Sequence, residues 1–178
     1  ENFEADPWPK WTFRLDENIV VQQEIFIPKG AGTATICWRL PRRVAHVSLS
    51  VRPFLSGRDY HALHHENPAF RFDADETNGH VAWHPYDGLP RIIAVSNGAY
   101  THQPDWYRSF QYDQERARGL DFAEDLASPG IFEWNLADDE ATLIFAAEGH
   151  EGDAVRANES AAGCMKRLRA AERKRRSF

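Results

Sequence analysis

The chain lacks the features that mark several large protein classes. Two cysteines, Cys37 and Cys164, make no disulfide framework and suit a reducing, cytoplasmic compartment. No apolar run approaches the roughly 20 residues of a membrane-spanning helix, so we expect no membrane partner. The sequence has no phosphate-binding loop, dinucleotide glycine fingerprint, serine nucleophile elbow or zinc-ligand spacing. We therefore expect no cofactor and no metal.

Positive charge is also scarce in the body of the chain. The net charge is −6, which argues against nucleic acid as a partner, and only the stretch 166–176 is basic. A length of 178 residues suits one domain with a sizeable core. The chain begins without a methionine, at Glu1, in what reads as the middle of a domain. We expect a fragment of a longer polypeptide.

What the chain does have is aromatic residues and short strand patterns. Aromatics make up 12% of the residues, with six Trp. Trp and Tyr are common both in packed sandwiches and on sugar-binding surfaces. Alternating apolar residues separated by turn signals predict an all-β, antiparallel sandwich. The predicted strands are 10–15, 18–27, 32–40, 44–55, 69–73, 80–84, 91–96, 128–136 and 140–147.

The connections and the end of the chain complete this prediction. Asn78-Gly79 is the strongest hairpin signal, and 97–104 is predicted to be a loop. For 106–120 the period is ambiguous, and we favour a strand with a bend near Gly119. From Asp153 the composition predicts a C-terminal α-helix with a narrow apolar stripe. We expect domains at 1–150 (sandwich) and 151–178 (helical connector).

The stretch 49–67 contains the main candidates for ligand-binding residues. An alternating strand breaks at Ser56-Gly57 into a loop crowded with polar groups, which is how a rigid sheet presents ligand-binding side chains. His61, His64 and His65 could bind a metal, bind sugar hydroxyls or satisfy the loop's own backbone. The neighbouring Arg58-Asp59 is either a self-contained ion pair or a ligand contact.

Two motifs carry a resemblance to a known family. The first is the strand that ends in Arg52-Pro53 and runs into Arg58-Asp59-Tyr60-His61. The second spans 106–130 and contains Trp-Tyr-Arg, Arg-Gly-Leu-Asp, Glu-Asp-Leu and Pro-Gly. Together they resemble the N-terminal domain of the bacterial and archaeal type of glycogen debranching enzyme, the amylo-α-1,6-glucosidase family.

The resemblance implies a galactose mutarotase-like supersandwich that is incomplete at its N-terminal side. It implies a parent glycoside hydrolase in glycogen catabolism, whose acid and base lie in an absent C-terminal helical domain. This chain would then be non-catalytic, with no catalytic residue of its own. Its partners would be α-glucan (glycogen, maltooligosaccharide) and that catalytic domain. The predicted carbohydrate contacts are Arg58, Tyr60, His61, His64 and Trp106.

Other assignments stay open at this point. Glycoside hydrolysis needs two carboxylates, and the acidic residues at 115, 121, 124 and 125 could supply them or could form a salt-bridged turn. The aromatic residues around 83–86 and 100–107 could stack on sugars or pack in the core. A stand-alone mutarotase or epimerase-like enzyme would need a facing pair such as His84 and Glu133. An interaction domain without any ligand is the third alternative.

Overall fold

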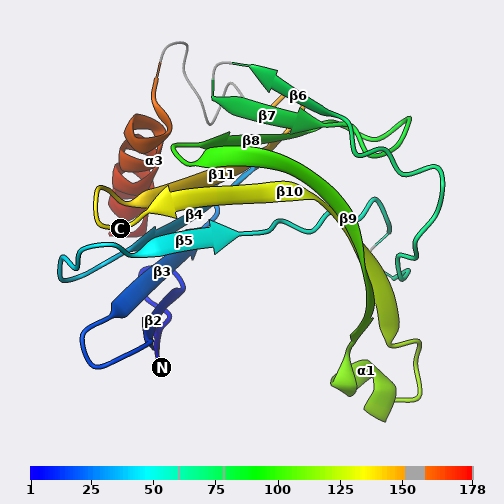
Figure 1. The fold of residues 1–178 in the computed structure, drawn as a ribbon, viewed down its shortest axis with the longest axis horizontal. Coiled ribbons are helices and arrows are strands. Elements are labelled where there is room, and N and C mark those ends of the chain that lie inside the picture. The colour runs from blue at the N-terminus through cyan, green and yellow to red at the C-terminus, as the bar shows by residue number, and fades with distance from the viewer. Residues whose placement is uncertain (60, 78, 151–158, 178) are drawn as a thin grey trace.

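The computed structural model describes residues 1–59, 61–77, 79–150 and 159–177, and these form two antiparallel sheets and two helices (Figure 1). The larger sheet has eight strands in the order β1-β2-β3-β4-β11-β8-β7-β6, and the smaller has three in the order β5-β10-β9. The predicted all-β sandwich with a C-terminal helix is confirmed. No helix in the described part of the chain is long and apolar enough to cross a membrane.

The elements have the following bounds. The eight-stranded sheet contains β1 (Asn2–Glu4), β2 (Lys10–Arg14), β3 (Val20–Phe26), β4 (Thr33–Arg39), β11 (Ala141–Ala147), β8 (Ile92–Ser96), β7 (His80–Trp83) and β6 (Ala74–Thr77). The three-stranded sheet contains β5 (Ser48–Val51), β9 (Ala99–Gln111) and β10 (Ala123–Asn135). The helices are α1 (Asp113–Ala117) and α3 (Ala161–Arg176).

Both faces of the large sheet are covered. Along β4, Trp38 faces the core shared with the small sheet, whereas its neighbour Cys37 faces the core under α3. Trp83 and Phe132 are almost fully buried on the first side, as is Ile144 on the second. Because successive residues of a strand point to opposite faces, the alternation predicted for 32–40 produces this two-sided core.

Helix α3 packs on the large sheet through the predicted apolar stripe. Its buried residues are Ala161, Cys164, Met165, Leu168 and Glu172. Ser160 is the N-cap, and its hydroxyl accepts from the Gly163 N–H. Glu172 accepts from the guanidinium groups of Arg175 and Arg176, and hydrogen bonding from Arg175 lowers the pKa of Glu172 to about 2. Whether 151–178 also connects to another domain stays a prediction.

Two predicted elements are wrong. Residues 69–73 form no strand. The hairpin that contains Gly79 pairs Thr77 with His80, so β7, which ends at Trp83, has partners only as far as Ala74. Residues 99–104 belong to β9 and are not a loop. Pro104 is tolerated in this strand because it lies at an irregularity, where the register shifts between Ser128 and Gly130 of β10.

The distal halves of β9 and β10 leave the body and curve away from it, with α1 at their far end (Figure 1). We call residues 106–127 the arm. A second register shift lies between Glu124 and Leu126, opposite Ser109, whose φ is 62°. Such bulges bend a strand pair and increase its twist. The strand predicted over 106–120 therefore extends only to Gln111, and the helix α1 follows.

Helix α1 is short and ends where the sequence indicated a bend. Gly119 has φ of +73° and its N–H donates to the Arg116 carbonyl at 3.0 Å. The left-handed conformation suits glycine, which has no Cβ to clash. The chain then returns through Leu120 and Asp121 into β10. The arm thus has a compact tip.

Candidate functional site

The loop after β5 runs along the free edge of β10. The Leu55 N–H donates to the Ala127 carbonyl at 2.8 Å, and the Asp125 N–H donates to the His64 carbonyl at 2.7 Å. These bonds satisfy edge groups of β10 that would otherwise lack a strand partner. The described residues of the 55–67 loop are therefore fixed to the base of the arm.

Glu124 anchors this loop from inside the arm. It is only 1% exposed, and its carboxylate receives two bonds from Arg58, at 2.8 and 3.1 Å. The His64 N–H donates to it at 3.1 Å, and the Tyr112 hydroxyl donates to it as well. Burial acts to raise the pKa of Glu124, but the bonds from Arg58, Tyr112 and His64 outweigh it and lower the pKa.

Of the two alternatives for Arg58-Asp59, the self-contained ion pair is therefore wrong. The Arg58 guanidinium pairs with Glu124, which lies 66 residues further along the chain, and reaches only the backbone carbonyl of Asp59. The Asp59 carboxylate instead accepts the His61 N–H at 2.9 Å, as in an Asx turn. The hydrogen bond to Glu124 raises the pKa of Arg58, so the guanidinium stays charged.

His64 points inward. It is 5% exposed, with Nδ1 at 3.0 Å from the Asp125 carbonyl and Nε2 at 2.7 Å from the Tyr86 hydroxyl. Because a carbonyl only accepts, Nδ1 carries the proton and Nε2 accepts from Tyr86. Burial lowers the pKa of His64, which agrees with this neutral tautomer. Its ring packs on Trp106, with centroids 5.3 Å apart.

Asp125 holds the other face of the arm. Its carboxylate accepts the N–H groups of Glu66 at 3.1 Å and Ser109 at 2.9 Å. These two bonds lower the pKa of Asp125. The second bond stabilises Ser109 in its left-handed conformation at the bulge. The adjacent residues Glu124 and Asp125 thus accept hydrogen bonds on opposite faces of β10, because successive side chains of a strand point to opposite faces.

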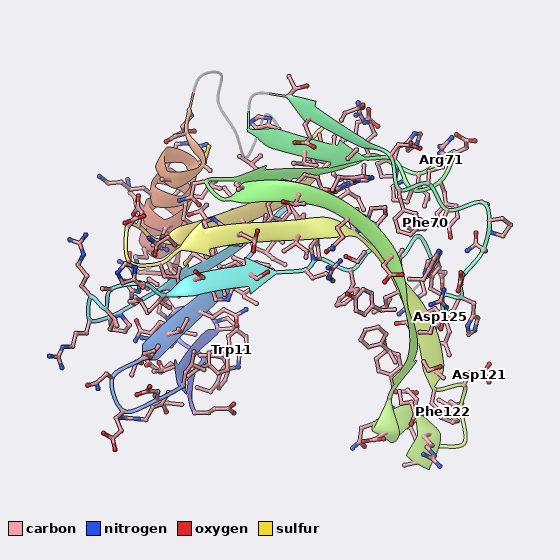
Figure 2. All side chains as sticks on the ribbon, viewed as in Figure 1. Trp11, Phe70, Arg71, Asp121, Phe122 and Asp125 are labelled. Carbon is pink, nitrogen blue, oxygen red and sulfur yellow. The ribbon has the colours of Figure 1, made fainter. Side chains whose placement is uncertain are left out.

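A groove of about 870 Å³ lies between the loop and the tip of the arm. It combines charged, hydrogen-bonding and apolar side chains. Its lining consists of Arg58, His61, Ala62, Leu63, His65, Tyr112, Glu115, Leu120 and Asp121. Figure 2 labels Asp121, Phe122 and Asp125 along this distal part of the arm. A surface of this composition can offer donors and acceptors to hydroxyl groups and an apolar floor to the C–H face of a ring.

The structure divides the five predicted contact residues. Arg58 and His61 line the groove. His64 and the half-buried Trp106 lie behind it and support the loop. Tyr60 lies outside the described residues. Sequence reasoning missed Tyr112 and Leu120 as groove residues, although both are exposed large side chains next to the helix α1.

The other candidates from the sequence are a metal site, the aromatic residues around 83–86 and 100–107, and the mutarotase-like pair. Among the described residues no group of His, Cys, Asp or Glu could hold a metal ion. Trp83 is fully buried, and its Nε1–H donates to the Tyr100 hydroxyl at 3.2 Å. For the mutarotase-like alternative, His84 follows β7 of the large sheet, and Glu133 is an exposed residue of β10 between the core residues Phe132 and Trp134, so its side chain points away from the core between the sheets.

Comparison with known proteins gives one family. The sequence pattern of the family described as "Glycogen debranching enzyme N terminal" matches residues 1–143. No curated protein and no solved structure matches the chain at a significant level. The family match covers both sheets up to the first residues of β11, including the whole arm and the groove.

Proposed function

The chain belongs to the family of glycogen debranching enzyme N-terminal domains, and we propose that it is a non-catalytic domain that binds α-glucan in the groove beside the arm. The lining of the groove carries this proposal. Arg58, His61 and Asp121 offer charged and polar groups around the apolar side chains of Leu63 and Leu120. Glucose units present hydroxyl groups at their rim and C–H groups on their faces, so both parts find complementary surface.

Bond cleavage belongs, in this proposal, to a helical catalytic domain elsewhere in a cytoplasmic parent enzyme. A glycoside hydrolase needs one carboxyl group whose pKa is raised, so that it can act as the acid. Glu124 and Asp125 are adjacent in β10 but lie on opposite faces of the arm, and the pKa of each is lowered by its hydrogen bonds. Glu115 pairs with Arg118 at 3.3 Å. These residues suit a rigid binding surface rather than acid–base catalysis.

Isothermal titration of the 178-residue chain with maltoheptaose tests the proposal. We expect binding, and we expect His61→Ala/Asp121→Ala to weaken it about tenfold or more, because hydrogen bonds to charged groups contribute about 1.5–3 kcal/mol each. Asp73→Ala, which removes an exposed carboxylate outside the groove, is the matched control. His64 is unsuited to this test, since its loss would free the loop.

The two results that would refute the proposal are simple. One is the absence of heat and of any spectroscopic change with maltoheptaose at millimolar concentration. The other is equal affinity of the double variant and of Asp73→Ala. Circular dichroism and urea unfolding of each variant establish that the fold is retained.

A further inference from the structure

Three aromatic residues lie next to the groove on the arm. Phe54 precedes the 55–67 loop, and Tyr107 and Phe110 belong to β9. The Phe54 ring meets Tyr107 at 5.1 Å and Phe110 at 5.3 Å between centroids, edge to face in both pairs. Phe54 is 40% exposed, and the other two are half-buried. We call these three residues the aromatic strip.

The strip and the groove share one face of the arm. Phe110 and Tyr112 are two residues apart in extended chain, so their side chains point the same way. Glu124 lies opposite Phe110 in the strand register, and residues directly opposite each other share a face. The Tyr112 hydroxyl and the Arg58 guanidinium both meet that carboxylate, and both line the groove. The strip and part of the groove lining therefore lie on the same face of the arm.

The opposite face of the arm is built differently. Asp125 there binds the backbone of Ser109 and Glu66, and Arg108 forms an ion pair with Glu66. Its polar groups are satisfied by one another, and its aromatic residue Trp106 is packed against His64 and Phe70, with ring centroids 5.3 and 5.2 Å apart. The face that carries the aromatic strip is therefore the one on which the Phe54 ring is left exposed.

We propose that the aromatic strip extends the groove into a longer track for an α-glucan chain, so that Phe54 selects long chains over short ones. This inference rests on the glucan binding proposed above and adds a length preference to it. A glucan chain is the occupant that fits, because aromatic surface is followed by a run of charged and polar groups at Arg58, Tyr112 and Asp121. The core of a protein interface is depleted of such charges.

The strip is already rigid before any ligand arrives. Arg52 lies over the Tyr107 ring at 5.2 Å and donates to the side chain and carbonyl of Gln103 and to the Ser128 hydroxyl. This clamp fixes the start of the arm against the body. A preformed surface loses little conformational entropy when it binds, so even a modest stacking contact adds affinity.

Titrating the 178-residue chain with maltotriose, maltopentaose and maltoheptaose tests the inference. For the unmodified chain we expect affinity to rise with length. Phe54→Leu keeps an apolar side chain but removes the ring, and we expect it to weaken maltoheptaose binding about three- to tenfold while maltotriose binding stays unchanged. Phe54→Trp should restore the length dependence. Phe3→Leu is the matched control, since Phe3 is an exposed phenylalanine paired with Trp11 at 5.2 Å on the other side of the molecule (Figure 2 labels Trp11).

The outcomes separate this inference from the proposed function. If Phe54→Leu matches Phe3→Leu for every oligosaccharide, the inference is wrong while groove binding stands, and a protein partner becomes the better occupant of the strip. If affinity is independent of length in the unmodified chain, the inference is wrong in the same way. If no oligosaccharide binds, the proposed function fails and the inference fails with it.

Discussion

The body of the sandwich and the arm are held together by different kinds of interaction. In the body, apolar side chains fill one core between the sheets and a second under α3, and Trp83 in the first and Ile144 in the second are fully buried. In the arm, the central buried group is the Glu124 carboxylate, held by Arg58, Tyr112 and a backbone N–H. The body depends on burial of apolar area, and the arm depends on completing a polar network.

This difference has an energetic consequence. Apolar burial is non-directional and spreads over many residues, so its loss weakens the whole cooperative unit. A buried charge is stable only while its partners remain, because an unpaired buried carboxylate costs several kcal/mol. The arm should therefore open as a local unit when one partner is removed, without unfolding the body.

The largest effect is expected from a substitution in the body. Trp83→Ala removes a fully buried ring from the core between the two sheets. We expect the free energy of unfolding to fall by about 4 kcal/mol, within the range for large-to-small core changes. Urea unfolding followed by far-UV circular dichroism measures it. Trp11→Ala, at a half-buried position near the sheet edge, is the control and should cost less than half as much.

A smaller and local effect is expected in the arm. Glu124→Gln preserves the side-chain volume but leaves the Arg58 guanidinium without its anionic partner. We expect arm amides, such as the Tyr112 N–H bonded to the Phe122 carbonyl, to exchange with an opening free energy lower by about 2 kcal/mol. Amides of β11 should keep their protection. Equal loss of protection in both regions would refute the division into body and arm.

The body was also the part that the sequence predicted well. The alternation in 32–40 correctly placed Trp38 and Cys37 on opposite faces, and the stripe of α3 was correctly assigned. Local periodicity is enough to predict the body because the alternation of apolar residues in each strand indicates which of its faces is buried. For β3 the same reasoning found the face of Val21 but missed Glu24 and Phe26, which are buried on the second side.

The arm could not be predicted in this way. Its defining contact joins Arg58 and Glu124 across 66 positions, and the pattern of neither segment indicates the other. The bulge at Ser109 shifts the alternation by one residue, so Tyr107 and Phe110 both contact Phe54 although their spacing of three residues suits a helix and not a strand. Of the predicted contact residues, Arg58 and His61 line the groove, whereas His64 and Trp106 lie behind it, and without the pairing this division was not predictable.

The smallest expected effect is the pH dependence of the stability of the arm, which the body should not share. The folded pKa of Glu124 lies below its ordinary value of 4.5, so its ionisation stabilises the arm fully above that pH, and this stabilisation is lost as the pH falls through the folded pKa. Tyr112→Phe removes one donor to the carboxylate. At neutral pH we expect the opening free energy of the arm to fall by about 1.5 kcal/mol, the low end for a hydrogen bond to a charged group, because Tyr112 is partly exposed.

The protection of arm amides in the unmodified chain and in Tyr112→Phe should become equal as the Glu124 carboxylate becomes protonated. Below pH 4.5 the unmodified arm loses the extra stabilisation that the Tyr112 hydroxyl gives to ionised Glu124, whereas Tyr112→Phe has less to lose. Hydrogen exchange of arm amides, corrected for intrinsic rates at each pH, measures the gap between them. Tyr107→Phe removes a hydroxyl from β9, the strand that precedes Tyr112, and should match the unmodified chain at every pH. A gap between the unmodified chain and Tyr112→Phe that stays constant from neutral to acid pH would show that the tyrosine acts through packing and not through the charge of Glu124, and the arm would then be built on the same principle as the body.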